Sequence, residues 1–327
     1  MNWIKFAALA ASVTMTLSAP AGGQEKIAFR LDWSLQGTHS PWFLAVEKGY
    51  FKAEGLDVTI LEGQGSATVV KLVASGSAEP IGFADYATMM KGVAQGLPVK
   101  AVFGINQTSP MIIMSRADNP VKTPKDMEGK IIAMAPAEST AQVYPALIAS
   151  AKIDGSKVSV LNPAVGAKMA LLLQGKVDAM TAGLNGQVPQ VEARGVKVEY
   201  FKYADYGVNT LNNGIVVNTQ FLAEKSDLVK RFLRAQAKGW ADARKNPTES
   251  IAALLKAKPE LAADKVVLTR QLELTFETLE TPNTKGKPLG WMSDADWEQT
   301  QSLLKQYADL TTTRPVQDYY TNDYLPQ

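Results

Sequence analysis

The fold of this chain is decided by Leu31–Asp57, which reads LDWSLQGTHSPWFLAVEKGYFKAEGLD. Trp33 ends a short strand-like segment, and a polar loop follows it. Ser40–Pro41 suits the start of a helix, because serine caps helix ends and proline loses no hydrogen bond at the first helical position. We expect this helix to end near Gly55 and the alternating residues of Leu56–Leu61 to form a strand. The order strand, loop, helix, strand predicts an α/β sheet.

The loop after the first strand is the first candidate ligand-facing surface, because ligands of open α/β sheets bind beyond the carboxyl ends of the strands. It gives three candidate binding residues, Trp33, Gln36 and His39. An indole can stack on a planar ligand, and the other two side chains can orient a ligand by hydrogen bonding. The alternatives are that Trp33 fills the core, Gln36 is solvated and His39 satisfies local backbone groups.

The composition limits the possible functions. The chain has 327 residues, 46% of them hydrophobic, so it can bury a large core, and its length favours two domains. With no cysteine and one histidine, it lacks the residues for disulfides, thiol nucleophiles, histidine-based triads and metal clusters. We therefore expect no metal, no cofactor and no enzymatic activity. The 34 basic and 32 acidic residues nearly balance, so the chain lacks the excess of positive charge that is typical of nucleic-acid-binding proteins.

The first residues have the pattern of an export signal. Lys5 precedes an apolar run, Phe6–Leu17, and Ala19–Ala21 fits the small-x-small cleavage pattern. The run is shorter than the roughly 20 residues that a membrane-spanning helix needs. We expect cleavage before Gly22 or after Gly23 and release into the periplasm, without a lipid anchor because no cysteine is available.

One supersecondary unit occurs twice in the sequence. Leu72–Asp85 reads as helix end, turn and short strand, and Leu171–Leu184 repeats this pattern. Gly76 of the first passage aligns with Gly175 of the second, each at a position suited to a helix C-cap. We expect two α/β lobes of similar build, with the ligand site in a cleft between them.

Two helix starts are candidate sites for an acidic group. Ser66 and Thr68 follow a glycine-rich turn in the first half, and Ser139 and Thr140 follow a short loop in the second. The free backbone N–H groups of a helix start suit carboxylate, sulfonate or phosphate. The alternative is that both are ordinary helix ends.

Residues that follow predicted strands complete the candidate set. In the first half these are Asp85, Tyr86 and Asn106, and their rough counterparts in the second are Tyr144 and Asn185. The alternatives are that Asp85 only caps the next helix and that Tyr144 only packs against its lobe.

Several motifs match a known family. They are Leu31–Trp33, His39, Gly49–Phe51 with Glu54–Val58, the glycine turns at 76 and 175, and Thr321–Pro326. By these motifs the chain resembles the substrate-binding proteins of bacterial ABC importers of the sulfonate, nitrate and thiamine-pyrimidine group. The resemblance implies a two-lobed, type II periplasmic binding protein in which each lobe is a mixed sheet flanked by helices. We expect a signal peptide at 1–23, the first lobe at 24–112 and 217–327, and the second lobe at 113–216.

The opening motif differs from that of the pyrimidine-binding branch of the family. That branch usually reads Leu-Asp-Trp-x-Pro-Asn-x-x-His-x-Gly, whereas here Leu35–Gln36 replaces Pro-Asn and Pro41 replaces the final glycine. Trp33 and His39 are kept. The resemblance therefore implies a stacking aromatic and a hydrogen-bonding histidine, with an amide lengthened from Asn to Gln.

The family is also similar to the eukaryotic thiamine-pyrimidine synthase. The synthase uses a cofactor-binding lysine and a sacrificial histidine four residues later, ahead of a Gly-Phe-Pro-Val turn. Gly96–Val99 matches that turn, but Ala84 and Thr88 stand at the two positions. The synthase's cysteine cluster is also missing.

We therefore expect a monomeric periplasmic binding protein that captures a small polar, aromatic or anionic solute by hinge closure and delivers it to an inner-membrane ABC permease. The solute would resemble a thiamine-pyrimidine precursor or a sulfonate. The alternatives are a synthase-like enzyme and a ligand-sensing module of a membrane receptor.

Overall fold

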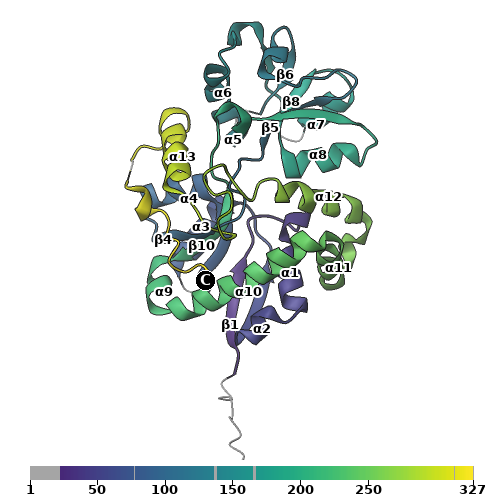
Figure 1. Cartoon of the computed structure of the whole chain (residues 1–327). Coiled ribbons are helices and arrows are strands. Elements are labelled where there is room, and N and C mark those ends of the chain that lie inside the picture. Colours follow the sequence, from purple (N-terminus) through teal and green to yellow (C-terminus); the bar gives the residue numbers. More distant parts are fainter. Residues whose placement is uncertain (1–22, 77, 136–137, 165–166, 313, 327) are drawn as a thin grey trace, which may run out of the picture.

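The computed structural model describes residues 23–326 except 77, 136–137, 165–166 and 313. The chain forms two lobes, each built on a five-stranded sheet (Figure 1). Most of the expected signal segment lies outside the described residues. Within the described part, no helix is both long and apolar enough to cross a membrane.

The two sheets have the same arrangement of strands. In spatial order, the lobe 1 sheet contains β2 (Leu56–Leu61), β1 (Glu25–Arg30), β3 (Ile81–Asp85), β10 (Asn213–Asn218) and β4 (Val99–Gly104). The lobe 2 sheet contains β7 (Ser159–Leu161), β6 (Ile131–Ala133), β8 (Ala179–Gly183), β5 (Met111–Arg116) and β9 (Val198–Lys202). In each sheet the first three strands are parallel, and the fourth is antiparallel to its neighbour. The expectation of two mixed-sheet lobes of similar build is confirmed.

Helices flank both sheets. The first part of lobe 1 contains α1 (Ser40–Glu47), α2 (Tyr50–Ala53), α3 (Ser66–Ser75) and α4 (Tyr86–Ala94). Lobe 2 contains α5 (Ser139–Gln142), α6 (Tyr144–Ser150), α7 (Lys168–Leu173) and α8 (Leu184–Glu192). The returning chain adds α9 (Thr219–Glu224), α10 (Ser226–Lys245), α11 (Pro247–Ala257), α12 (Lys265–Phe276) and α13 (Asp294–Tyr307). Among these, α10 lies across lobe 1, whereas α12 lies at the junction with α8 of lobe 2 (Figure 1).

The opening helix differs from the prediction in two ways. It is broken into α1 and α2 at Gly49, whose φ of 70° lies in the left-handed region that glycine tolerates best. Ser40 is not its cap, because its buried Oγ instead contacts the Oγ of Ser250 on α11 at 2.8 Å. A short 3₁₀ helix, Gly37–His39, enters α1 in place of the expected cap.

The chain crosses between the lobes twice. Because β5 lies wholly in the lobe 2 sheet and β10 wholly in the lobe 1 sheet, the crossings are the segments 105–110 and 203–212. The boundaries expected after residues 112 and 216 fall inside these two strands, a few residues too late. Both crossings pass beside the cleft and supply residues to it.

An aromatic cluster lies in the core of lobe 1, next to His39 of the loop 31–39. Trp42 on α1 packs against Phe29 of β1 and Phe83 of β3, with ring centroids 5.2 and 4.9 Å away. Its indole Nε1 donates to Gln236 Oε1 on α10 at 2.7 Å. Burial of such large rings contributes much of the stability of a domain. The loop 31–39 therefore rests on a rigid base.

Candidate functional site

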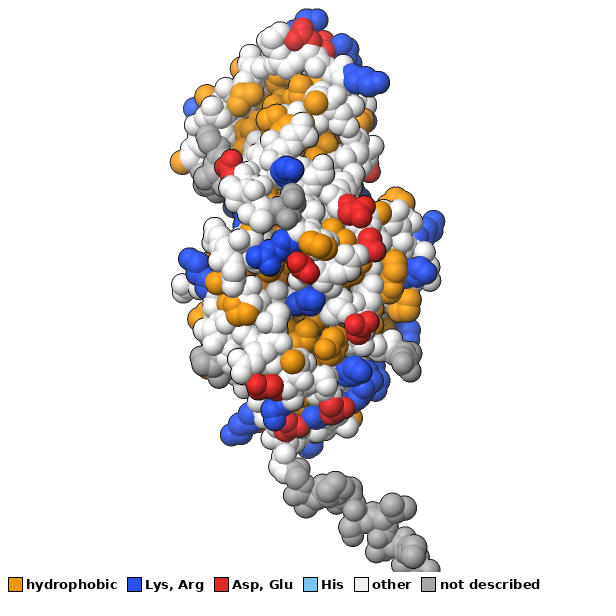
Figure 2. All heavy atoms as spheres, turned by 90° about the vertical axis from the view of Figure 1, so that its left-hand side faces the viewer, with side chains coloured by type: hydrophobic (Ala, Val, Ile, Leu, Met, Phe, Trp, Pro, Cys, Tyr) orange, Lys and Arg blue, Asp and Glu red, His pale blue; other side chains and the backbone are white. Residues whose placement is uncertain are grey.

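The candidate site is made of three adjoining hollows between the lobes. The lobe 1 hollow, of about 620 Å³, is lined by the loop 32–36 and the starts of α3 and α4. The lobe 2 hollow, of about 290 Å³, is lined by residues of β5, α5, α7, β8 and α8. Asn212 lines both, and a third hollow of about 210 Å³ shares Asp85 with the first and Met111 with the second. The surface shows no patch of a single charge on the face seen in Figure 2.

In the lobe 1 hollow, Asp32 is held as a fixed acceptor. His39 Nε2 lies 2.9 Å from Asp32 Oδ1, and Asn213 Nδ2 donates to Asp32 Oδ2 at 2.7 Å. The backbone N–H of Gln36 donates to His39 Nδ1 at 3.1 Å, so the ring proton belongs on Nε2 and is donated to Asp32. His39 is only 1% exposed. The histidine therefore positions Asp32 and does not itself face the cleft.

Asp85 is the second carboxylate of this hollow. Its Oδ1 accepts from the backbone N and the Oγ1 of Thr88, both at 2.7 Å, so it caps α4 as the sequence predicts. Asn212 Nδ2 donates to Oδ2 at 3.1 Å. Burial raises the pKa of Asp85, the Thr88 hydrogen bonds lower it, and the nearby charge of Asp32 raises it again. Two carboxylates thus share one wall, and no lysine or arginine of the described residues forms an ion pair with either.

Trp33 and Gln36 lie on the loop in front of these carboxylates. Both line the lobe 1 hollow, and the Trp33 side chain is 52% exposed. The alternative that Trp33 fills the core is excluded, because a core residue would be buried, and contact with a ligand stays a prediction. A half-exposed indole beside two acceptors offers a stacking face with hydrogen-bond partners at its edge.

Two polar groups at the start of α3 take part in contacts within the chain. Ser66 lines the hollow, but its Oγ accepts the backbone N–H of Asp85 at 3.0 Å, and the N–H of Gly65 donates to the carbonyl of Asp32 at 2.7 Å. Thr68 is exposed and lies outside the hollows. An anion at this helix start would also meet the Asp32 and Asp85 carboxylates.

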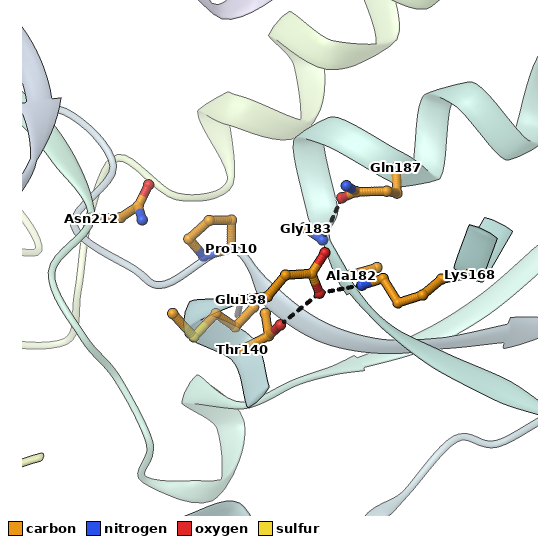
Figure 3. Close-up of a pocket in the computed structure, with 9 residues that line it drawn as sticks. Pro110, Glu138, Thr140, Lys168, Ala182, Gly183, Gln187 and Asn212 are labelled. Atoms are coloured by element: carbon orange, nitrogen blue, oxygen red, sulfur yellow. Dashed lines mark hydrogen bonds and ion pairs between the residues drawn. The ribbon is translucent and has the colours of Figure 1, made fainter. Parts of the chain in front are cut away.

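In the lobe 2 hollow, Lys168 and Glu138 form a buried ion pair (Figure 3). The lysine Nζ donates to Glu138 Oε2, to the Thr181 carbonyl at 2.7 Å and to Thr181 Oγ1 at 3.2 Å. The three ammonium hydrogens therefore all have acceptors within the chain. The lysine side chain is 3% exposed and the glutamate side chain is 20% exposed, so the carboxylate is the member of the pair nearer the cleft.

A residue at the start of α5 also hydrogen-bonds to the carboxylate of this ion pair. Thr140 lines the hollow, and its Oγ1 donates to Glu138 Oε2 at 3.4 Å. Ser139 begins α5, but its side chain lies outside the described part of the structure. Gln187 on α8 lines the opposite edge, where its Oε1 accepts the N–H of Gly183 at 2.7 Å (Figure 3).

Four further predicted residues, besides His39 and Thr68, lie away from the three hollows. Tyr86 is fully buried and donates to the Phe103 carbonyl at 2.7 Å, so it is a core residue. Asn106 is buried in the first crossing, where its backbone pairs with Asn213. Tyr144 packs into the lobe 2 core, and burial raises its pKa to about 12. Asn185 donates to Thr275 Oγ1 on α12 at 3.2 Å and joins the two lobes there.

Several residues of the hollows were missed from the sequence, among them Asp32, Asn212, Glu138 and Lys168. Asp32 stands beside the predicted Trp33, and Asn212 directly precedes β10, so a charged or amide side chain at the end of a strand was the signal that could have found them. Glu138 and Lys168 have no such signal, since they are far apart in the chain and meet only in the folded lobe. The described residues contain no group of three or more His, Cys, Asp or Glu placed to hold a metal ion.

Comparison with known proteins gives relatives that span nearly the whole chain. It is 27% identical over 292 residues to the riboflavin-binding protein RibY of Chloroflexus aurantiacus, covering 88% of this chain and 82% of the relative. It is 25% identical over 303 residues to a formylaminopyrimidine-binding protein of Halalkalibacterium halodurans, covering 91% and 90%. Synthases of 4-amino-5-hydroxymethyl-2-methylpyrimidine phosphate also match, at 21% and 24% identity.

Among solved structures, the periplasmic aliphatic sulphonate-binding protein SsuA of Escherichia coli superposes with a TM-score of 0.70, at 15% identity, over 92% of this chain and 99% of that one. Its two-lobed architecture agrees with the fold described above, so the chain has the solute-binding protein fold of ABC import systems. The NMT1/THI5 like family matches residues 36–250, which include both crossings and the lobe 2 wall, while Asp32 and Trp33 of the lobe 1 wall precede the matched range. The chain therefore belongs to the NMT1/THI5 like family.

Proposed function

We propose that this protein is the periplasmic solute-binding component of an ABC importer and that its ligand is a small planar nitrogen heterocycle of the aminopyrimidine class. The ligand is captured between the lobes by hinge closure and then delivered to the inner-membrane permease. The protein acts as a monomer in the periplasm, and its signal peptide is cleaved on export. Trp33, Asp32 and Asp85 are the first ligand contacts.

The observation that carries this proposal is the Asp32 carboxylate fixed behind the exposed face of Trp33. His39 and Asn213 hold Asp32 in one orientation, so its remaining lone pairs are pre-positioned for a ligand donor. Asp85 adds a second acceptor in the same hollow. A ring with amino or ring N–H groups satisfies these acceptors while its face stacks on the indole.

The two crossings support the proposed closure of the cleft. Asn212 lies on the second crossing and lines both hollows, so a rotation about the two crossings brings the lobe 2 wall towards Trp33. The relatives support the ligand class, because riboflavin and formylaminopyrimidine both contain a planar nitrogen heterocycle. An importer role is supported by the same relatives and by the fold.

The test is a calorimetric and thermal-shift screen of residues 24–327 with 4-amino-5-hydroxymethyl-2-methylpyrimidine, formylaminopyrimidine, riboflavin, an alkanesulfonate and nitrate. A ligand at 100 times its dissociation constant adds about 2.7 kcal/mol to the free energy of unfolding, which gives a clear shift. We expect a heterocycle to bind and Trp33→Ala to abolish the shift. The control is Trp291→Ala, outside the hollows. Binding of the sulfonate or nitrate alone would contradict the proposed ligand class.

The synthase alternative finds little support in the same residues. Ala84 is buried in β3, and the Thr88 hydroxyl donates to Asp85, so neither position offers an amine or an imidazole. His39 has both ring nitrogens in contacts within the chain and is buried. Incubation with pyridoxal phosphate followed by mass spectrometry tests this alternative, and a stable adduct on one lysine would favour it.

A further inference from the structure

The lobe 2 hollow contains a cation that the proposed ligand contacts do not use. Lys168 is 2% exposed, yet it is one of the residues that line the hollow, where it lies next to Glu138 and Ala182 (Figure 3). An ammonium group in such a place is the usual partner of a ligand anion. Here, however, its hydrogens are directed to Glu138 and to two oxygen atoms of Thr181.

Glu138 is placed between this lysine and the cleft. It comes from the loop that enters α5, and Thr140 supports its carboxylate from the first turn of that helix. The Glu138 carboxylate, supplied by the chain itself, thus pairs with the ammonium group and cancels the charge of Lys168.

The facing wall carries the same sign of charge. Asp32 and Asp85 line the lobe 1 hollow, and closure brings them towards Glu138. Lys91 lines the third hollow together with Asp85, and its positive charge lowers the pKa of that carboxyl. The Asp85 carboxylate in turn partly compensates the charge of Lys91. Three carboxylates therefore surround the cleft, with two lysines that both face a carboxylate.

We propose that the Glu138–Lys168 pair is an anion-exclusion device: Glu138 masks the lysine of the lobe 2 wall, so the cleft accepts an uncharged or protonated heterocycle and rejects its phosphate ester. This inference deepens the proposed function and rests on it for the ligand ring. Lys168 acts as a positioning residue for Glu138. Glu138 determines specificity by occupying the place that a phosphate or sulfonate would need.

The physical basis is the cost of bringing a second anion to a cation that is already neutralised. A phosphate would have to displace the Glu138 carboxylate from Lys168 and leave that carboxylate desolvated among Asp32 and Asp85. The unesterified alcohol carries no such charge. The two compounds differ only in the phosphoryl group, so their affinities report the effect of the wall charges directly.

The experiment compares 4-amino-5-hydroxymethyl-2-methylpyrimidine with its phosphate ester, and adds inorganic phosphate as a probe without the ring. In the wild type we expect the ester to bind at least about tenfold more weakly than the alcohol, the equivalent of about 1.4 kcal/mol, and inorganic phosphate to give no thermal shift. Glu138→Gln keeps the size and one acceptor but removes the charge. It is expected to bind inorganic phosphate and to reverse the preference towards the ester.

The control is the double variant Glu138→Gln, Lys168→Met, which should lose the acquired phosphate binding because the cation is gone. A Glu138→Gln protein that folds but acquires no anion binding would overturn the proposal. So would a wild type that binds the ester as tightly as the alcohol. Should Glu138→Gln fail to fold, the wild-type ratio decides by itself.

Failure of the two proposals can be told apart. A wild type that binds none of the heterocycles contradicts the proposed ligand class. If Glu138→Gln then still acquires phosphate binding that depends on Lys168, anion exclusion is supported without the ring. Binding of heterocycle and ester alike has the opposite meaning, since it supports the ligand class and overturns anion exclusion.

Discussion

The two walls of the cleft are built on sheets of the same strand order, but their carboxylates have different partners. In lobe 1, the Asp32 and Asp85 carboxylates are held by neutral donors, namely His39, Asn213, Thr88 and Asn212. In lobe 2, the Glu138 carboxylate is held by a buried ammonium group. A carboxylate that is held by neutral donors keeps its charge available to a ligand, whereas one paired with a lysine does not.

This difference shows that sheet order alone does not set the chemistry of a binding cleft. The same strand order in both lobes places polar side chains at the same edge of each sheet. Whether the charge of such a side chain is available to a ligand depends on the residues that hydrogen-bond to it or form an ion pair with it. The variants below change those supporting residues on one wall at a time.

The largest effect is expected from Lys168→Met. It removes the ammonium group, leaves two oxygen atoms of Thr181 without that donor and leaves Glu138 uncompensated in a largely buried place. We expect a loss of about 3 kcal/mol in the free energy of unfolding, measured by urea denaturation. Lys157→Met, which removes a largely exposed lysine of the same lobe, is the control and should change little. A loss below about 1 kcal/mol would mean that the pair is not desolvated.

Asp32→Asn is expected to reduce the free energy of unfolding less than Lys168→Met does, but to weaken ligand binding clearly. The amide keeps the shape but loses the charge that a ligand donor contacts. We expect affinity for the heterocycle to fall by about tenfold to a hundredfold, because hydrogen bonds to charged groups contribute about 1.5–3 kcal/mol. Calorimetric titration measures this. Asp57→Asn, at an exposed position on β2, should bind as the wild type does.

The Asp85 carboxyl gives a test that depends on pH. Its pKa is raised by burial, so the folded protein holds this proton more tightly than the unfolded chain does. Ionisation of Asp85 therefore costs stability as pH rises above the unfolded pKa, and the cost is complete above the folded pKa. Asp85→Asn removes it, so the stability of the variant relative to the wild type should rise as the pH is raised from the pKa of the unfolded carboxyl through the higher pKa of the folded one. A pH-independent difference in urea unfolding would contradict this.

The smallest effect is expected at the ion pair that joins α12 to α8 on the outside of the lobes. Arg270 Nε lies 3.1 Å from Glu192 Oε2, and both side chains are more than a third exposed. We expect Arg270→Gln to cost less than about 1 kcal/mol of unfolding free energy. The contrast with Lys168→Met compares two ion pairs of one protein that differ in burial. Equal losses for the two variants would remove burial as the explanation.

Much of the fold could be predicted from local pattern. The alternation of 56–61 matches β2, and the repeated unit with Gly76 and Gly175 matches α3–β3 and α7–β8, where both glycines have positive φ. The break of the opening helix at Gly49 was missed because an isolated glycine in an apolar pattern does not show its φ. Strand β9 was missed because its aromatic and polar residues, 198–202, do not alternate clearly.

The candidate site could be predicted only in part. The side chains that follow strands locally, Trp33, Gln36, Ser66, Asp85 and Thr140, do line the hollows. His39 points inward because the neighbouring Gly37 packs so closely on α12 that a Cβ would lie 1.8 Å from the Leu268 carbonyl, which fixes the turn. Such contacts join residues from distant parts of the chain. A pattern within one segment of sequence cannot predict such contacts. The Glu138–Lys168 pair was missed for the same reason.

The place of β10 between β3 and β4 has a consequence for the order of folding. The first 110 residues supply four strands of the lobe 1 sheet, but the strand that joins β3 to β4 arrives only after the whole of lobe 2 has been made. Lobe 2, in contrast, uses one continuous stretch, 111–202. During synthesis the leading third of the chain therefore cannot complete its sheet. The lobe 1 sheet is completed only when β10 has been made, so lobe 1 depends on a pairing between distant parts of the chain and is expected to fold after lobe 2.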